Sequence, residues 1–195
     1  FHGIDQDNNI YYSSNQSGSI NSCMYKINLN DIKGESIAMT KTSGTNNVSF
    51  SKGMKYFKNS YTDQNPPPFI TLHRTVDGAR IQLLEDNSEF NETLLEYNLS
   101  KKEFFTIKPE EGIELNAWIM KPIDFDPNKK YPLYMFLYGG PGSQQVTNSW
   151  GWFNYFWYQY LNQQGYIVAC VDNRGTGGKG AEFKKMTYLE LGKYE

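Results

Sequence analysis

One short segment, residues 138–143, places a phenol beside a glycine-rich turn. The apolar run 131–138 ends at Tyr138 and is followed by Gly-Gly-Pro-Gly-Ser. Ligands of open α/β sheets bind at the carboxyl ends of such strands, and glycines let the backbone turn sharply and approach a substrate closely. The Tyr138 hydroxyl is therefore a candidate hydrogen-bond donor into a crevice. The alternative is structural: Tyr138 covers a core and the glycines only form a turn.

A second glycine pattern is formed by Gly175, Gly177 and Gly180, which match the dinucleotide fingerprint G-x-G-x-x-G. That site needs its first glycine at the end of the first parallel strand, with the pyrophosphate at the N-terminus of the next helix. Here Asn173 and Arg174 intervene, and the pattern follows the second expected parallel strand. A tight surface loop, in which Arg174 pairs with a carboxylate, is favoured over NAD binding.

Other catalytic and metal-binding motifs are absent from the sequence. It contains no G-x-S-x-G nucleophile elbow and no G-x-x-x-x-G-K-[ST] phosphate loop. His2 and His73 are isolated, and His73 lies in an expected strand, which favours a structural role. Two cysteines so far apart, Cys23 and Cys170, exclude a disulfide framework and a cysteine-based zinc site. Neither a metal nor a cofactor is expected.

The residues around Tyr138 have the pattern of an α/β unit. Residues 131–138 and 166–172 are continuous apolar runs, typical of strands buried on both faces. Short connections to an intervening helix predict a parallel pair with a right-handed crossover. Upstream, residues 104–107 and 113–120 flank a turn at 108–112 and predict a hairpin. The helix should bury one apolar stripe, formed by Phe153, Phe156, Trp157, Tyr160 and Leu161.

Residues 1–103 have the different pattern of an antiparallel β meander. Short apolar runs alternate with polar, glycine-containing stretches. Asp77-Gly78 predicts a hairpin turn, the prolines at 66–68 predict a loop, and residues 87–100 contain a candidate short helix. One to two propeller blades of four strands would fit this length. The expected strands include residues 10–13, 24–29, 36–39, 48–50, 56–57, 69–74 and 81–84.

Composition narrows the class of protein. The 195 residues carry 19 Lys and Arg against 21 Asp and Glu, too balanced a charge to favour nucleic-acid or membrane-surface binding. Fifteen Tyr, 12 Phe and 4 Trp favour a packed protein over a disordered one. No apolar run approaches the ~18 residues of a membrane span. Because the chain begins without Met and stops in a helical pattern without a cap, we expect an excerpt of a longer protein.

Two motifs at this spacing resemble the prolyl oligopeptidase family. The first is Tyr138-Gly139-Gly140-Pro141-Gly142-Ser143-Gln144, and the second is Val171-Asp172-Asn173-Arg174-Gly175-Thr176-Gly177. Residues 48–52, 71–73 and 84–87 are similar to the last propeller segment of the dipeptidyl peptidase IV branch. The resemblance implies that residues 1–103 are the C-terminal part of a β-propeller domain. Residues 104–195 would be the N-terminal part of an α/β-hydrolase catalytic domain, truncated before the nucleophile.

The resemblance also implies an activity, that of a serine exopeptidase. Such enzymes remove N-terminal dipeptides from peptides whose penultimate residue is Pro or Ala. Tyr138 matches the family tyrosine whose hydroxyl forms half of the oxyanion hole. The Ser, Asp and His of the triad would follow residue 195, and the acids that hold the substrate's amine would precede residue 1. This chain alone would then be inactive.

Several alternatives stay open. Within the enzyme class, the parent could be a prolyl tripeptidyl or an acylaminoacyl peptidase. The Gly175–Gly180 pattern leaves an NAD-binding oxidoreductase open, and a non-catalytic propeller binding module with a degenerate hydrolase part is a third class. By resemblance the parent is expected to be a homodimer and an exported bacterial protein of the periplasm or cell envelope. The isolated chain is expected to self-associate through exposed sheet edges.

Overall fold

The computed structural model describes residues 1–31, 33–64, 67–109 and 112–194. The chain forms two compact units. The first contains Phe1–Glu92 together with Asn148–Trp150, and the second contains Thr93–Thr147 and Gly151–Glu195. The assignment of residues 1–103 and 104–195 to propeller and hydrolase domains stays a prediction.

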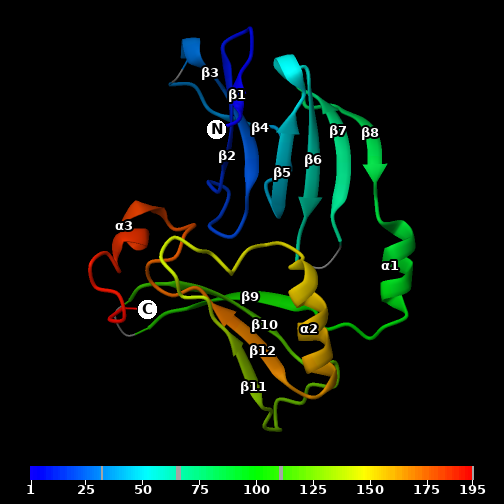
Figure 1. Ribbon diagram of the computed structural model, residues 1–195, viewed down its shortest axis with the longest axis vertical. Helices are drawn as coiled ribbons and strands as arrows, with labels where there is room; N and C mark the ends of the chain where they lie inside the picture. The colour runs from blue at the N-terminus through cyan, green and yellow to red at the C-terminus, as the bar shows by residue number, and fades with distance from the viewer. Residues whose placement is uncertain (32, 65–66, 110–111, 195) are drawn as a thin grey trace. The chain divides into compact units, whose positions relative to one another are not determined.

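The first unit contains two four-stranded antiparallel sheets, in which consecutive strands pair along the chain (Figure 1). This confirms the predicted meander, and α1 (Ser88–Leu95) confirms the short helix. One sheet consists of β1 (Gly3–Ile4), β2 (Asn9–Ser14), β3 (Cys23–Asn28) and β4 (Ile37–Ala38). The other consists of β5 (Thr45–Phe50), β6 (Tyr56–Thr62), β7 (Phe69–Arg74) and β8 (Arg80–Glu85). Two 3₁₀ turns, η1 (Leu29–Asp31) and η2 (Lys52–Met54), follow β3 and β5. Of the predicted proline loop, Pro66 lies outside the described residues.

The core of the first unit brings side chains of both sheets together. Tyr11 of β2, Met24 of β3 and Phe57 of β6 are fully buried in one cluster. The Tyr11 hydroxyl donates a 2.8 Å hydrogen bond to Asp5, so its polar end is satisfied inside an apolar environment. Burial and the Asp5 carboxylate both raise the pKa of Tyr11, because each disfavours the phenolate.

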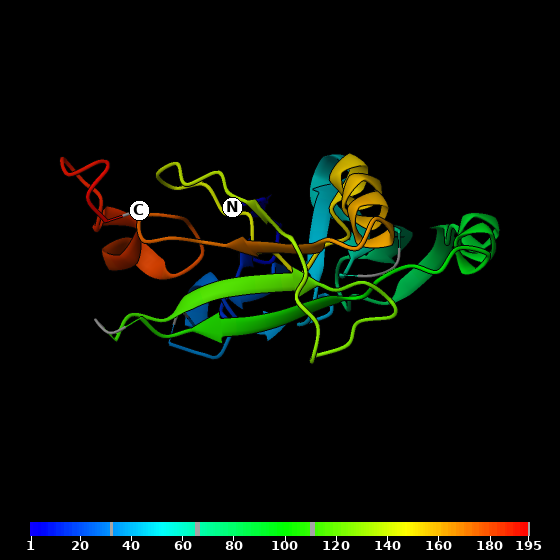
Figure 2. The same cartoon turned by 90° about the horizontal axis from the view of Figure 1, so that it is seen from below.

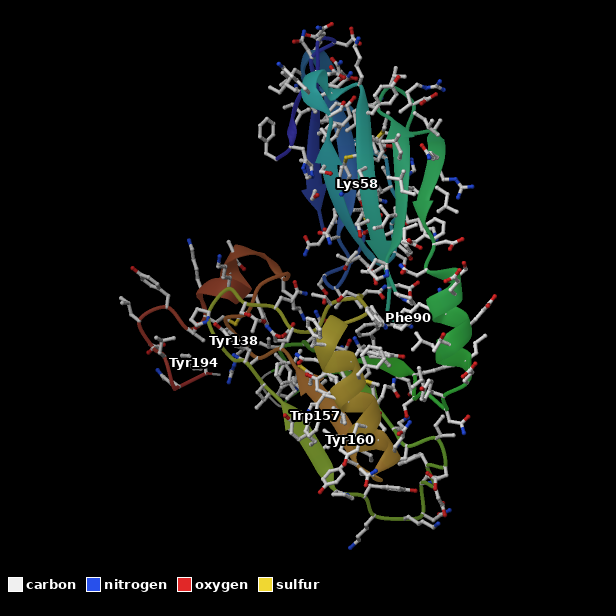
Figure 3. The ribbon with its side chains drawn as sticks, turned by 45° about the vertical axis from the view of Figure 1, so that its right-hand side comes forward. Lys58, Phe90, Tyr138, Trp157, Tyr160 and Tyr194 are labelled. Atoms are coloured by element: carbon white, nitrogen blue, oxygen red, sulfur yellow. The ribbon has the colours of Figure 1, made fainter. Side chains whose placement is uncertain are left out.

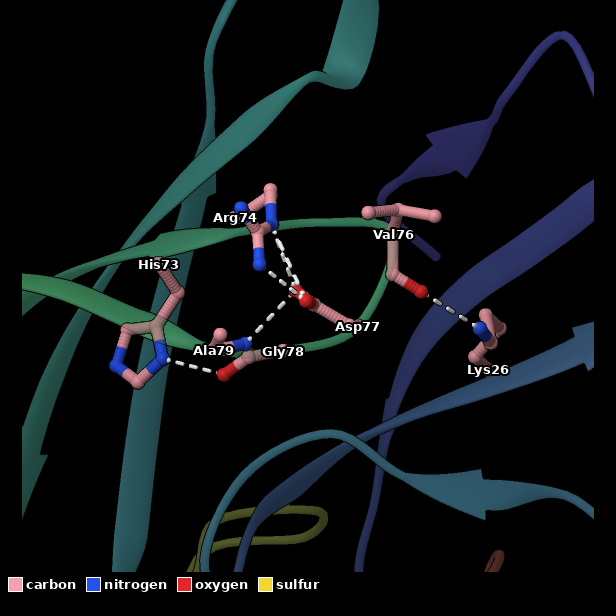
Figure 4. A network of polar contacts seen from close by, with 7 residues as sticks. All are labelled: Lys26, His73, Arg74, Val76, Asp77, Gly78 and Ala79. Atoms are coloured by element: carbon pink, nitrogen blue, oxygen red, sulfur yellow. Dashed lines mark hydrogen bonds and ion pairs between the residues drawn. The ribbon is translucent and has the colours of Figure 1, made fainter.

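The predicted turn at Asp77-Gly78 is confirmed and joins β7 to β8 (Figure 4). The Asp77 carboxylate accepts hydrogen bonds from the Arg74 guanidinium and from the Ala79 N–H. Gly78 has φ +71°, a left-handed conformation that glycine adopts without steric cost. The Nδ1–H of His73 donates to the Gly78 carbonyl at 2.9 Å, and its Nε2 lies 2.8 Å from the Thr71 hydroxyl. With both ring nitrogens engaged, His73 has the structural role predicted for it.

Three residues from late in the chain, Asn148–Trp150, belong to the first unit. Asn148 is buried, and its N–H donates to the Ile20 carbonyl at 2.8 Å. Its side-chain oxygen accepts from the Gln64 N–H at 3.1 Å, and its carbonyl accepts from the Thr45 hydroxyl at 2.9 Å. Its amide nitrogen donates to Asn21 at 3.1 Å. Nothing in the sequence pattern singled out this segment.

The second unit is built on one mixed four-stranded sheet in the order β11-β12-β10-β9 (Figures 1 and 2). β11 and β12 are parallel, and the other neighbouring strands are antiparallel. This confirms the predicted hairpin and the predicted parallel pair, although Glu110 and Glu111 of the hairpin turn lie outside the described residues. The strands are β9 (Lys102–Ile107), β10 (Leu115–Met120), β11 (Leu133–Phe136) and β12 (Ile167–Val171); the helices are α2 (Trp152–Gln163) and α3 (Gly180–Lys185).

The expectation that residues 131–138 form a strand buried on both faces is wrong. β11 is only four residues long and lies at the edge of the sheet, paired with β12 alone. Its Phe136 ring faces Tyr158 of α2 at 6.0 Å, whereas Leu133 and Met135 point to the other face, where Leu133 is 55% exposed. An edge position with one covered face explains both the short strand and the exposure. β12, one strand further in, is buried as predicted.

The helix between these strands is present, but the predicted buried stripe is wrong. Phe153 is 91% exposed, and Phe156, Trp157 and Tyr160 are also exposed; of the predicted stripe only Leu161 is buried. The buried side of α2 carries Tyr155, Tyr158, Gln159, Leu161 and Asn162. Two of these are amides that bond to backbone groups of the same unit, so the buried side combines apolar packing with hydrogen bonding.

These amide contacts are specific. Gln159 accepts from the Ser100 N–H at 2.7 Å and donates to the Ser100 carbonyl at 2.8 Å. Asn162 donates to the carbonyls of Met120 and Tyr166 at 3.1 and 2.8 Å. Such pairs satisfy backbone groups that would otherwise be costly to bury. In the described part of the chain, no helix has the length and apolar character required to cross a membrane.

Candidate functional site

Tyr138 lies two residues beyond the end of β11, on the loop that leaves this strand (Figure 3). It is 66% exposed and therefore does not cover a core. Its ring packs directly against the backbone of Gly140, so closely that a Cβ at this position would collide with the ring. Glycine at 140 thus allows the phenol to lie along its own loop, with its hydroxyl end accessible.

A second loop, which follows β12, holds the Tyr138 loop by backbone contacts. Because β11 and β12 are parallel neighbours, both loops leave the same edge of the sheet. The Gly142 N–H donates to the Gly175 carbonyl at 2.8 Å, and the Gly177 N–H donates to the Ser143 carbonyl at 3.0 Å. A Cβ at Gly177 would lie 3.0 Å from the Gly142 carbonyl oxygen, so the close approach requires glycine.

Asp172 joins the same two loops through its side chain. It follows β12 directly and is 3% exposed. One carboxylate oxygen accepts from the Gln145 N–H at 2.8 Å and the other accepts from the Val146 N–H at 3.0 Å. Burial raises the pKa of this carboxyl, while the two backbone hydrogen bonds act in the opposite direction. In the sequence, Asp172 stands out only as part of a motif, although a carboxylate directly after a buried strand is itself a signal.

Asn173 adds a contact at the start of the Tyr138 loop. Its side-chain amide donates to the Gly139 carbonyl at 3.3 Å and to the Arg174 carbonyl at 2.7 Å. The residue next to the phenol is therefore tied to the loop after β12. The Tyr138 loop is therefore bound at both ends, by Asn173 at Gly139 and by Asp172 at Gln145 and Val146.

The dinucleotide interpretation of Gly175, Gly177 and Gly180 does not fit this geometry. Gly175 packs against Thr187, its N–H donates to the Phe183 carbonyl, and α3 starts only at Gly180. The glycines thus serve close packing between loops. Arg174, expected to pair with a carboxylate, instead donates to the Tyr194 carbonyl at 2.8 Å; Glu195 lies outside the described residues.

Other candidate positions do not converge on Tyr138. Cys23 and Cys170 are both free and buried, and burial raises the pKa of the Cys170 thiol to about 12, which disfavours a reactive thiolate. His2 bonds to the Ser13 hydroxyl at 2.8 Å, far along the chain from residues 138–146. Within the ranges that the structure describes, no group of three or more His, Cys, Asp or Glu side chains could hold a metal ion.

Comparison with known proteins finds similarity to peptidases over nearly the whole chain. The model of the dipeptidyl peptidase IV N-terminal region matches residues 2–68, and that of the prolyl oligopeptidase family matches residues 152–195. The crystal structure of Porphyromonas gingivalis dipeptidyl peptidase 4 superposes with a TM-score of 0.91 at 39% identity, covering 99% of this chain and 27% of that one. Both matches and this structural neighbour relate the chain to the prolyl oligopeptidase family.

Two relatives at about one-third identity carry dipeptidyl peptidase names. A probable dipeptidyl-aminopeptidase B of Podospora anserina is 33% identical over 98% of this chain and 21% of its own length. A probable dipeptidyl peptidase 4 of Emericella nidulans is 31% identical over 98% of this chain and 25% of its own length. The chain thus spans about a quarter of the length of these relatives. Tyr138 lies between the two family-model matches, so its role stays a prediction.

Proposed function

We propose that this chain is part of a serine dipeptidyl peptidase that removes N-terminal dipeptides from peptides with penultimate Pro or Ala. Its two four-stranded meanders belong to the last blades of a β-propeller, and its β11–α2–β12 unit belongs to the start of an α/β-hydrolase domain. Similarity over nearly the whole chain to proteins named dipeptidyl peptidases supports this proposal. So does the parallel pair β11–β12 with its intervening helix.

Tyr138 supplies one donor of the oxyanion hole. When a serine attacks a peptide carbonyl, negative charge develops on the carbonyl oxygen, and a fixed O–H donor stabilises that charge without reorganising at the moment of reaction. The observation that carries this role is the position of Tyr138: exposed, at the carboxyl end of a parallel strand, on a loop held by a second loop. The second donor and the triad of Ser, Asp and His belong to other parts of the parent protein.

The decisive experiment replaces Tyr138 by Phe in the full-length protein. Loss of one oxyanion donor lowers kcat by roughly 100- to 1000-fold, with little change in KM, because the donor acts on charge that develops in the transition state. Turnover of a chromogenic Xaa-Pro substrate measures this effect. Tyr160→Phe, which removes the hydroxyl of an exposed tyrosine on α2, is the matched control and leaves kcat unchanged. A change in KM alone would reduce Tyr138 to a substrate contact.

Two further measurements test where the triad lies and which substrates the parent protein cleaves. The isolated chain shows no turnover of the same substrate, because the triad is supplied elsewhere; measurable turnover would contradict that assignment. In the full-length protein, a dipeptidyl peptidase releases the chromophore from a free Xaa-Pro substrate faster than from a tripeptidyl or an N-acylated one. The reverse preference would favour the tripeptidyl or acylaminoacyl alternative.

Assembly and location are part of the same proposal. The parent is a homodimer, exported to the periplasm or cell envelope of a bacterium, and the isolated chain self-associates. The exposed outer face of β11, with Leu133 and Met135, and the edge position of this strand support self-association. Light scattering of the isolated chain tests it, and a monomer at all concentrations would exclude it. Fractionation of cells that make the full-length protein tests the location.

A further inference from the structure

The geometry points to Asp172 as a positioning residue for Tyr138, acting through the backbone of the loop that carries the phenol. This inference rests on the proposed role of Tyr138 as an oxyanion donor. Asp172 does not touch the phenol. It fixes the far end of the loop, where its two carboxylate oxygens accept the N–H groups of Gln145 and Val146 at 2.8 and 3.0 Å.

The loop depends on such contacts because it has little regular structure of its own. Residues 137–147, all of which the structure describes, contain no helix or strand. The bonds that it makes to the loop after β12 add to its own turns and to the burial of Val146 in holding this segment. Most of these bonds join neutral groups, at Gly142 and Ser143 and through the Asn173 amide. Asp172 contributes the carboxylate, and hydrogen bonds to an ionised group are roughly twice as strong as neutral ones.

The anchor itself is rigid. Asp172 directly follows β12, and its own N–H donates to the carbonyl of Asn116 in β10 at 2.9 Å. This bond continues the pairing of β10 with β12 by one residue beyond Val171. Asp172 thereby links the Tyr138 loop to the two central strands of the sheet, β12 and β10. An oxyanion donor is effective only when it is held within about 0.5 Å of its productive position, so a loop that moves by more than this loses the benefit of the hydroxyl.

A purely structural role for Asp172 would have different consequences. Loss of a structural hydrogen bond lowers the melting temperature, but the folded fraction keeps its kcat, and the effect is independent of the Tyr138 hydroxyl. Loss of a positioning residue lowers kcat in fully folded protein, leaves KM nearly unchanged, and matters little once the hydroxyl is gone. The two roles are therefore separated by a double-mutant cycle.

The experiment uses the full-length protein with Asp172→Asn, Tyr138→Phe and the double variant, assayed with a chromogenic Xaa-Pro substrate. Asparagine keeps the shape of the side chain, but its NH2 group faces one of the two backbone donors. We expect Asp172→Asn to lower kcat by roughly 10- to 100-fold, as for a lost supporting contact, with KM changed by less than about threefold. In the Tyr138→Phe background the same change lowers kcat by less than about threefold.

Asp126→Asn is the matched control. The Asp126 carboxylate also accepts a backbone N–H, that of Asn128 at 2.9 Å, but on an exposed turn that does not contact the Tyr138 loop. We expect the Asp126→Asn variant to leave kcat unchanged. Normal kcat for Asp172→Asn, or equal losses with and without the Tyr138 hydroxyl, would overturn the positioning role. Normal kcat for Tyr138→Phe would instead overturn the proposed function.

A second variant and a second measurement cover the case in which Asp172→Asn does not fold. Gly177→Ala leaves Asp172 intact but pushes a Cβ toward the Gly142 carbonyl, so it displaces the same loop and lowers kcat while KM is kept. Hydrogen exchange of the unmodified protein tests the two hydrogen bonds to Asp172 directly. We expect the amides of Gln145 and Val146 to exchange slowly. Rapid exchange of both amides would show that the anchor is not formed, and would overturn the inference whatever the kinetics.

Discussion

The two units of this molecule differ in what selects their buried side chains. In the first unit, alternation along short strands directs Tyr11, Met24 and Phe57 into one core, as the pattern of apolar residues indicates. In the second unit, α2 turns its amides Gln159 and Asn162 inward and leaves Phe153 exposed. Apolar alternation thus locates the core of the first unit, although its sheets also bury polar side chains such as Asn46 and Asn59. On α2 the buried side mixes apolar and amide side chains, so apolar periodicity alone does not identify it.

The largest effect is expected in the first unit, at a residue that no pattern indicated. Asn148→Ala removes the three hydrogen bonds that the buried Asn148 side chain makes to Gln64, Asn21 and Ser43. We expect the free energy of unfolding to fall by ~3 kcal/mol, measured by urea denaturation. Asn30→Ala, at an exposed asparagine, is the control and changes it by less than ~0.5 kcal/mol. Equal effects would mean that apolar packing alone determines the stability of this unit.

The next effect tests the orientation of α2. Gln159→Ala leaves the Ser100 N–H and carbonyl without their side-chain partner, and we expect the free energy of unfolding to fall by ~2 kcal/mol. Phe153→Ala, at a side chain that is almost fully exposed, costs less than ~0.5 kcal/mol. Thermal unfolding of both variants gives the comparison. If Phe153→Ala were the more destabilising change, the predicted apolar stripe would be the buried one after all.

These contrasts show how much of the fold could be read from the sequence. The strands of the meander, the Asp77-Gly78 turn and the short helix α1 follow from local chemistry: alternation, a turn dipeptide and their spacing. The parallel pair β11–β12 follows from apolar runs around a helix. The edge position of β11 does not, because strand order in a sheet depends on the contacts of β9 and β10, which residues 131–138 do not record.

The candidate site was predictable only in part. Tyr138 and its glycines stand out because they follow an apolar run, and the loop geometry around them agrees with a close backbone approach. The anchoring by Asp172 and Asn173 was not predicted, since their partners are backbone groups of a loop more than 25 residues earlier. Backbone donors and acceptors are the same at every position, so the sequence does not show which of them the side chains of Asp172 and Asn173 bind.

An effect of about the same size, which depends on pH, comes from a cation buried in the second unit. Burial lowers the pKa of Lys102 to about 8, and its ammonium group lies 5.4 Å from the centre of the Trp118 ring. Between pH ~8 and ~10.5 the unfolded chain binds a proton that the folded chain has lost, so this residue raises stability with pH there. Below pH ~8 both states are protonated and the burial penalty is fully present.

Lys102→Met tests this cation. We expect it to stabilise the protein by ~2 kcal/mol at pH 7, less than the full penalty because the cation–π contact is lost. The gain shrinks as the pH rises toward ~10. Urea unfolding of both proteins at pH 7, 8, 9 and 10 measures the difference. A gain that stayed constant with pH would mean that Lys102 titrates normally and that the variant acts through packing.

The smallest effect is expected in the first unit, at a turn that the sequence predicts. Gly78→Ala places a side chain at φ +71° in the Asp77-Gly78 turn, with its Cβ 3.3 Å from the Met39 methyl group, and should cost ~1 kcal/mol. Gly53→Ala has a similar φ of +76° but open space around the Cβ. Because both share the backbone strain, their difference isolates the Met39 contact, a few tenths of a kcal/mol. Two unfolding curves that coincide would show that the turn is determined by backbone conformation alone, which is the kind of rule that a sequence reveals.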